Sequence, residues 1–136
     1  MKKFDPWPFW RRWLGQRSER AAACYLRSKR YRILAANVAD RSGEFDLLAL
    51  DGRVIVFVEV RSTSGSDPQV ALATVDRAKQ KRLVDSAVRF LGRHRLHGIA
   101  SRFDVLGLAW PADKKVPTII HVVDAFSPTD RFQFHS

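Results

Sequence analysis

The alternation of apolar and polar residues is clearest between positions 43 and 61, on either side of Asp51-Gly52. Alternation with a period of two is typical of a strand with one buried face, and an Asp-Gly pair between two such runs favours a hairpin turn. The pattern therefore predicts two paired strands, over Gly43 to Leu50 and over Arg53 to Ser62.

The register of this hairpin follows if Asp51 and Gly52 are the two central residues of the turn. Counting outward then pairs Leu50 with Arg53, Asp46 with Phe57, and Glu44 with Glu59. Side chains alternate between faces, so one face is wholly apolar and comprises Phe45, Leu47, Ala49, Val54, Val56, Val58 and Val60. The far end of the other face carries Glu44, Asp46, Glu59 and Arg61. A three-residue loop with a bulge would shift the pairs but keep Glu59 and Arg61 on one face.

Three carboxylates and one guanidinium at one end of a sheet face require a cause. Like charges opposite each other weaken a sheet, and partly buried carboxylates are costly unless a cation binds them. An ion-pair cluster with Arg61 at an exposed sheet end is one explanation. The other is a divalent-metal site, since Mg²⁺ binds one or two carboxylates and keeps several waters.

A helix is predicted ahead of the strands, from about Gln16 to Arg30. Ser18 fits the N-cap, and Glu19 in the first turn suits the positive end of the helix dipole. Glu19 also begins a stripe with helical spacing that continues with Ala22, Ala23 and Leu26. Glu19 is therefore either a residue that complements the dipole or one that faces the protein interior.

The remaining elements complete an α/β pattern. Strands are expected over Tyr31 to Val38, Arg102 to Ala109 and Thr118 to Val123, and one long helix from Val70 or Thr74 to Leu96. The order α-β-β-β-α-β-β predicts a mixed sheet flanked by helices. The right-handed crossover rule places the strand near residue 105 parallel to one of the earlier strands.

The composition indicates one globular domain with an anionic partner. The chain has 136 residues and a net charge of +10, which points first to nucleic acid and second to an anionic membrane surface. A single cysteine, Cys24, excludes an internal disulfide and fits a reducing compartment. No apolar run approaches the ~18 residues of a membrane-spanning helix, and Pro6 and Pro8 interrupt any signal peptide. We therefore expect no stable membrane insertion and a cytoplasmic location.

Two basic segments are candidate binding surfaces. Residues 1–14 form an aromatic-basic N-terminal arm, which can cover apolar surface, anchor at a membrane interface or stack on bases. The long helix has few acidic residues, and its basic side is predicted to bind phosphates through Arg77, Lys79, Lys81 and Arg82. His94 and His97 stand three residues apart with no further ligand nearby, which is weak support for zinc.

Several short motifs occur together in one order. Glu19 is followed by Gly43-Glu44-Phe45-Asp46-Leu47-Leu48, then by Phe57-Val58-Glu59-Val60-Arg61, Lys79-Gln80 and Arg102-Phe103-Asp104-Val105. In these motifs the chain resembles the YraN-like family of predicted bacterial endonucleases, which are considered distant relatives of archaeal Holliday-junction resolvases. The resemblance implies a restriction-endonuclease-like fold for a nuclease-like domain at 15–126, followed by a C-terminal tail at 127–136.

The resemblance also implies an active site of the PD-(D/E)xK type. Asp46 and Glu59 would be the carboxylate ligands of Mg²⁺ or Mn²⁺, with the backbone carbonyl of Val60 as a third ligand. Glu19 would complete or orient the site from the first helix. Gln80 would reach into it from the second helix.

Arg61 departs from that motif, which has a lysine at this position. Arginine is always protonated and cannot act as a base, but it neutralises charge and binds phosphate in bidentate fashion. Arg61 is therefore compatible with electrostatic stabilisation, and water activation would fall to a bound metal. Asp104 also matches the family pattern, and a structural pairing with arginine explains it equally well.

Three hypotheses follow for the function. The favoured one is a metal-dependent DNA endonuclease that acts on branched or structured DNA, as a homodimer by analogy. The alternative is a nucleic-acid-binding protein whose catalysis is weak or lost because Arg61 replaces the lysine. The third is a basic RNA-associated structural protein, for which the carboxylate cluster would be dispensable.

Overall fold

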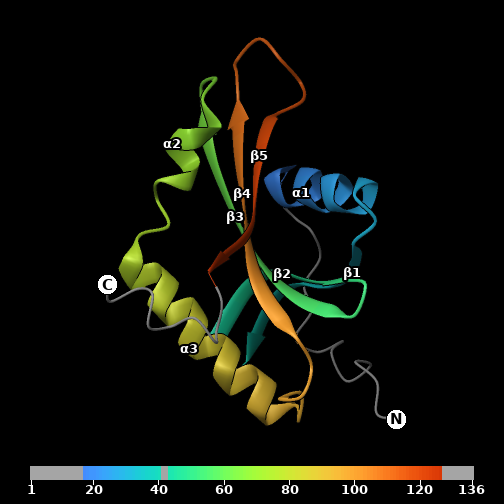
Figure 1. The fold of residues 1–136 in the computed structure, drawn as a ribbon. Coiled ribbons are helices and arrows are strands. Elements are labelled where there is room, and N and C mark those ends of the chain that lie inside the picture. The colour runs from blue at the N-terminus through green and yellow to red at the C-terminus, as the bar shows by residue number, and fades with distance from the viewer. Residues whose placement is uncertain (1–16, 41–42, 127–136) are drawn as a thin grey trace.

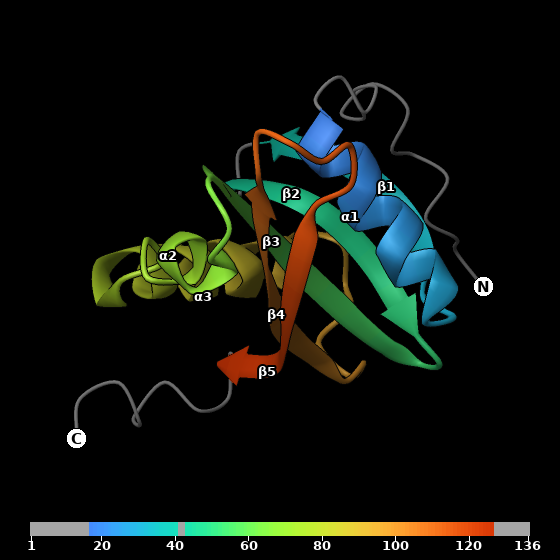
Figure 2. The same cartoon turned by 90° about the horizontal axis from the view of Figure 1, so that it is seen from above.

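A five-stranded sheet with helices on both faces forms the body of the computed structural model, which describes residues 17–40 and 43–126 (Figure 1). The predicted N-terminal arm and C-terminal tail lie outside these residues. In chain order the elements are α1 (Arg17–Ser28), β1 (Arg32–Asp40), β2 (Gly43–Asp51), β3 (Val54–Ser64), α2 (Pro68–Leu72), α3 (Arg77–Arg93), β4 (Ser101–Trp110) and β5 (Thr118–Phe126). Figure 2 shows α1 on one face of the sheet and α2 and α3 on the other. The predicted mixed sheet flanked by helices is confirmed.

The strand order in the sheet follows the sequence, β1-β2-β3-β4-β5. The strands β3 and β4 are parallel neighbours, whereas the other neighbouring pairs are antiparallel. A parallel pair needs a crossover connection, and here α2 and α3 provide it. The predicted parallel placement of the strand near residue 105 is therefore confirmed, and Val105 pairs with Glu59.

The hairpin of β2 and β3 forms where predicted, but its register differs by two residues from the prediction. Leu50 pairs with Ile55 rather than with Arg53, so the centre of the turn moves to Gly52-Arg53. Gly52 adopts a φ of 62°, a left-handed conformation that glycine tolerates best. Because faces alternate with a period of two, a shift of two residues leaves most side chains on their predicted faces.

The predicted pairs at the far end of the hairpin are also wrong. The pairing of β2 with β3 ends at Leu47 and Val58, and the next residues away from the turn are Asp46 and Glu59. Asp46 therefore lies beside Glu59, not opposite Phe57. Glu44 pairs with β1 and is exposed to solvent, so it does not face Glu59.

Two apolar clusters hold the helices against opposite faces of the sheet. The cluster beneath α1 is mostly aliphatic and includes Ala22, Leu26, Leu47, Ala49, Val56 and Val58. Beneath α3, the ring centroid of Phe90 lies 5.8 Å from that of Phe45 and 5.9 Å from that of Phe57. Strict alternation predicts Phe45 on the α1 face with Leu47, and this expectation is wrong. The alternation of β2 breaks where the strand separates from β3.

The segment predicted as one long helix holds two helices, and the later predicted start, Thr74, is the nearer to the start of α3 at Arg77. Asp76 is the N-cap of α3, and its side-chain oxygen accepts a hydrogen bond from the backbone N–H of Lys79 at 2.8 Å. Because an N-cap residue has an extended rather than a helical conformation, α3 cannot continue from α2 without a break. The break places Lys79 in the first turn of α3, close to the sheet.

The short helix α2 packs closely on β4 at Gly107. A Cβ atom added to Gly107 would lie 2.8 Å from the backbone oxygen of Pro68 and 2.8 Å from Cγ of Leu72. Real side chains do not approach so closely, so this contact requires a glycine. The contact anchors the crossover connection over the parallel strands.

The helix α1 begins at Arg17, one residue before the predicted N-cap. Ser18 therefore lies inside the helix, where its hydroxyl oxygen accepts a hydrogen bond from Nε1–H of Trp110 at 2.8 Å. This bond ties the start of α1 to the end of β4. Within residues 17–40 and 43–126, no helix has both the length and the apolar character that crossing a bilayer requires.

Candidate active site

Two carboxylates on neighbouring strands form the centre of the candidate site. Asp46 and Glu59 lie within hydrogen-bonding contact of each other. Asp46 Oδ2 accepts a hydrogen bond from the backbone N–H of Val60 at 2.7 Å. Because β2 no longer pairs with β3 here, the carboxylate of Asp46 takes the place of a backbone acceptor. Glu59 is only 6% exposed, and Asp46 is partly buried.

Burial is the main reason that both carboxyl groups resist ionisation. Burial raises the pKa of Asp46, although hydrogen bonds from Val60 and Glu59 oppose the rise. The pKa of Glu59 rises to about 7, first through burial and then through the negative charge of Asp46. The pair therefore keeps a proton up to near neutral pH, and a cation that binds both groups would relieve the repulsion between them.

Two cations approach the pair from different elements. Arg61, on the same strand as Glu59, brings its Nη2 to 3.1 Å from Glu59 Oε2. Lys79, in the first turn of α3, brings its Nζ to 3.6 Å from the same oxygen. Arg61 Nε is buried and has no hydrogen-bond partner among the described residues. An anion with spare acceptor oxygens, such as a phosphate, is the kind of group that would satisfy it.

The charge of a third acidic group, on α1, acts on Asp46. The negative charge of Glu19 on α1 raises the pKa of Asp46, which places Glu19 near that carboxylate. Glu19 Oε1 accepts a hydrogen bond from Asn37 Nδ2–H at 3.2 Å. Asn37 on β1 has a φ of 50°, a conformation that asparagine adopts more readily than most residues. Sequence reasoning missed Asn37, because no spacing pattern links it to Glu19.

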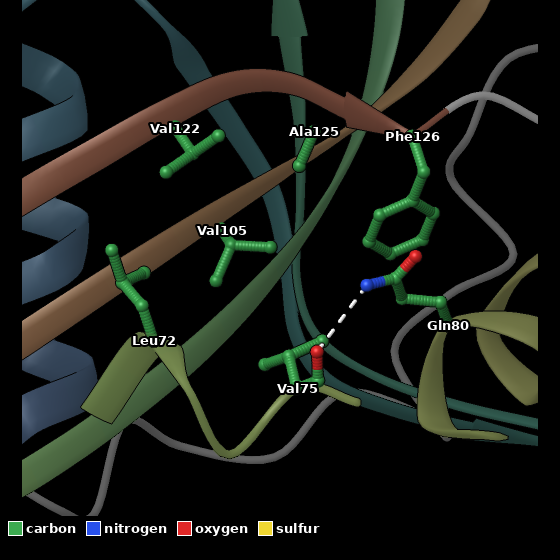
Figure 3. A pocket seen from close by; sticks show the side chains of 7 residues that line it. All are labelled: Leu72, Val75, Gln80, Val105, Val122, Ala125 and Phe126. Atoms are coloured by element: carbon green, nitrogen blue, oxygen red, sulfur yellow. Dashed lines mark hydrogen bonds between the residues drawn. The ribbon is translucent and has the colours of Figure 1, made fainter. Parts of the chain in front are cut away.

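Gln80 lines a pocket whose other lining residues are apolar (Figure 3). Its Nε2–H donates to the backbone oxygen of Val75 at 3.3 Å. The pocket has a volume of about 230 Å³ and is lined by Leu72, Val75, Gln80, Val105, Val122, Ala125 and Phe126. Val105 is the strand partner of Glu59, and paired residues on parallel strands share a face of the sheet. The pocket and the carboxylates are therefore neighbours on the α3 face.

The basic residues predicted to bind nucleic acid occupy two environments. Lys79 lies against the carboxylate pair, as described above. Lys81 is exposed and forms an ion pair with Asp85 at 3.2 Å. Arg77 and Arg82 are also exposed on α3. The helix thus presents positive charge both to the carboxylates and to solvent.

Asp104 is the centre of a second buried network. Its carboxylate accepts hydrogen bonds from the side chains of Tyr31, Arg102 and His121 at 2.7–3.0 Å, and from the backbone N–H of Asp124 at 3.0 Å. The predicted pairing of Asp104 with an arginine is confirmed. Sequence reasoning missed His121, which comes from the far side of the last turn.

Metal binding at the candidate site would rest on two carboxylates. Among the described residues, no group of three or more His, Cys, Asp or Glu side chains is placed to hold a metal ion. Mg²⁺ does not need such a group, because it binds through one or two carboxylates and retains several waters. The Asp46–Glu59 pair therefore matches the donor set of Mg²⁺ or Mn²⁺ and does not match a site for zinc.

Comparison with known proteins places the chain among relatives of one family. The sequence profile described as "Uncharacterised protein family UPF0102" matches residues 18–108. A UPF0102 protein of Rhodopirellula baltica is 44% identical over 117 residues, which cover 84% of this chain and 70% of the relative. A UPF0102 protein of Pelotomaculum thermopropionicum is 38% identical over 116 residues, covering 85% and 97%. One from Geotalea uraniireducens is 36% identical over 113 residues, covering 83% and 88%.

Proposed function

The chain belongs to the uncharacterised protein family UPF0102, and we propose that it is a metal-dependent DNA endonuclease. The observation that carries the proposal is the pair of Asp46, which is partly buried, and Glu59, which is buried; their carboxyl groups are hydrogen-bonded to each other and both have raised pKa values. If the two carboxylates only stabilised the fold, we would expect more hydrogen-bond donors and cations around them, because buried acids are costly unless fully paired. A divalent cation between the two carboxylates would supply the missing charge.

The donor set favours Mg²⁺ or Mn²⁺ as that cation. Asp46 and Glu59 would be its protein ligands, and the family resemblance adds the carbonyl of Val60. When bound, the metal would supply Lewis-acid chemistry to the phosphodiester and its attacking water. Glu19, held by Asn37, would add negative charge beside Asp46 and orient the site from α1.

The reaction proposed is hydrolysis of a DNA phosphodiester. The oxygen of a water molecule forms a bond to phosphorus, and one phosphorus–oxygen ester bond breaks. The water loses a proton and the leaving oxygen gains one, so the products are a phosphate monoester and a hydroxyl. Arg61 would bind a phosphate oxygen through its buried Nε–H and neutralise charge as the reaction proceeds.

Charge on the rest of the molecule supports a DNA substrate. The net charge is +10, and exposed Arg77, Lys81 and Arg82 lie on the same helix as Lys79. Such residues bind phosphates without reading sequence, so recognition would depend on DNA shape, as at a branch or a flap. Action as a homodimer stays a prediction by analogy.

The alternative is a nucleic-acid-binding protein without catalysis. It is favoured by one observation, the ion pair between Arg61 and Glu59 at 3.1 Å. In that case Arg61 would serve as a fixed counter-charge for the carboxylate, and no metal would be needed.

Cleavage of labelled DNA tests the proposal against the alternative. Linear, flapped and four-way-junction DNA are incubated with the protein and Mn²⁺ or Mg²⁺, in parallel with Asp46→Asn and Glu59→Gln. We expect metal-dependent cleavage by the unaltered protein and none by either variant. Asp113→Asn, which removes an exposed carboxylate on the β4–β5 turn, is the matched control and should cleave normally. Binding without cleavage, unaltered in both variants, would leave the DNA-binding alternative.

A further inference from the structure

The two cations at the carboxylate pair differ in what they can do for a substrate. Arg61 lies on β3, and one terminal nitrogen of its guanidinium group is 3.1 Å from Glu59 Oε2. Lys79 lies in the first turn of α3, and its Nζ is 3.6 Å from the same oxygen. The ammonium group of a lysine has three N–H donors on a compact centre. One contact with Glu59 therefore leaves two donors for other oxygens.

We propose that Lys79 is a catalytic residue of this site, which holds an oxygen of the scissile phosphate or of the attacking water through its ammonium group. In this assignment Arg61 binds the phosphate from the strand, and Lys79 supplies from a helix the lysine that the strand lacks. The proposal rests on the proposed function, because it assigns a role within the same reaction.

The position of Lys79 is fixed at both ends. Its backbone N–H donates to the N-cap oxygen of Asp76 at 2.8 Å, which sets where the first turn of α3 lies. Its ammonium group lies 3.6 Å from Glu59 Oε2 and is less than one-third exposed. A side chain held in this way needs little further ordering when a substrate binds.

The charge of Lys79 acts on the whole pair and not on one partner. The positive charge of Lys79 favours ionisation of both Asp46 and Glu59 and so lowers the pKa of each. The charge of Lys79 thus acts on both of the carboxylates that would hold the metal. No other lysine of the described residues forms an ion pair with Asp46 or Glu59.

The test combines cleavage with metal binding in three variants. Lys79→Ala removes the proposed residue, and the double variant Lys79→Ala/Arg61→Lys returns a lysine to the site from the strand. Lys115→Ala removes an equal charge from the exposed β4–β5 turn and controls for the change in net charge. Cleavage rates are measured with Mn²⁺, and Mn²⁺ affinity is measured without DNA by titration calorimetry.

We expect Lys79→Ala to slow cleavage by roughly 100-fold or more, the scale on which losing one preorganised donor acts. Its Mn²⁺ affinity should rise several-fold, because a cation that competes for Glu59 has been removed. The double variant should recover at least one-tenth of the unaltered rate. Lys115→Ala should match the unaltered protein in both measurements.

The outcomes separate this proposal from the proposed function. Cleavage by Lys79→Ala within about threefold of the unaltered rate would overturn the assignment and leave the nuclease intact. Slow cleavage together with weakened Mn²⁺ binding would also overturn it, because it would show a collapsed site. Absence of cleavage by the unaltered protein would overturn the nuclease proposal itself, and the role of Lys79 with it.

Discussion

The pKa values of two buried carboxyl groups in this protein, Asp104 and Glu59, are shifted in opposite directions. Asp104 is fully buried, yet its pKa falls to about 2, because hydrogen bonds from His121 and Arg102 outweigh the effect of burial. Glu59 is almost as deeply buried, yet its pKa rises to about 7. The first carboxylate is surrounded by donors, whereas the second has another carboxylate as its neighbour.

This contrast distinguishes an acid with a structural role from a candidate metal ligand. Asp104 has its donors inside the fold, so nothing from outside is required for it to be charged. Asp46 and Glu59 have two partly exposed cations and each other, so their charge is incompletely balanced. Incomplete balance in a buried pair has a free-energy cost, and sites with such perturbed groups are candidates for function.

Removal of the carboxylate of Asp104 should destabilise the protein more than the substitution of Glu59 or Tyr31. In Asp104→Ala, the donors Tyr31, Arg102 and His121 lose their shared acceptor, which leaves buried polar groups unpaired. We expect the free energy of unfolding at pH 7 to fall by about 3–5 kcal/mol, the range for breaking a buried ion pair. Urea unfolding followed by circular dichroism measures it.

The exposed Asp113→Ala serves as the control for Asp104→Ala and should change the free energy of unfolding by less than about 0.5 kcal/mol. A loss below about 1 kcal/mol in Asp104→Ala would contradict the structural role and remove the contrast between the two centres.

The second effect has the opposite sign and comes from Glu59→Gln. The pKa of Glu59 rises from an ordinary 4.5 to about 7 on folding, so the protonated form is favoured in the folded state. The protonated Glu59 side chain therefore adds to the free energy of unfolding below pH 4.5, and this stabilisation is lost as the pH rises through 7. At about 1.4 kcal/mol per pH unit, the variant should be more stable than the unaltered protein by up to about 3 kcal/mol above pH 7.

Urea unfolding between pH 4 and pH 9 measures this difference. The two stability curves should coincide below pH 4.5 and separate as the pH rises. If Glu59→Gln is instead the less stable protein at pH 8, the ion pairs with Arg61 and Lys79 dominate, and the pair is a structural element after all.

Removal of one hydrogen-bond donor to Asp104 should lower the free energy of unfolding least. Tyr31→Phe removes a hydroxyl that donates to Asp104 Oδ2 at 2.8 Å and accepts from Arg102 at 2.6 Å. Three donors to Asp104 remain, so we expect a loss of about 1–2 kcal/mol, the scale of a hydrogen bond to a charged group. The same unfolding measurement tests it, and a loss as large as that in Asp104→Ala would contradict a distributed network.

The strands and the helix faces could be predicted because local periodicity carries them. The pattern around Asp51-Gly52 located the hairpin, and Glu59 with Arg61 on one face followed from alternation alone. The register could not be predicted, since it depends on which two residues occupy the centre of the turn. Those residues are Gly52 and Arg53, and that choice brings Asp46 beside Glu59.

Contacts between distant elements escaped the sequence for a different reason. Lys79 reaches the carboxylates because α3 begins after Asp76, whereas the pattern leaves the start of this helix open between Val70 and Thr74. Asn37 and His121 each meet their partners only after the sheet has formed. The spacing of these residues along the chain does not predict these contacts.

The close contact at Gly107 has a consequence for variation within the family. Because a single methyl group there would strike the backbone of α2, the residue at this position and the presence of α2 are linked. A relative that carries a side chain at the equivalent position should have a shortened or displaced crossover helix. Aligned sequences from many genomes can therefore show, without any structure, which members keep α2 packed against their parallel strands.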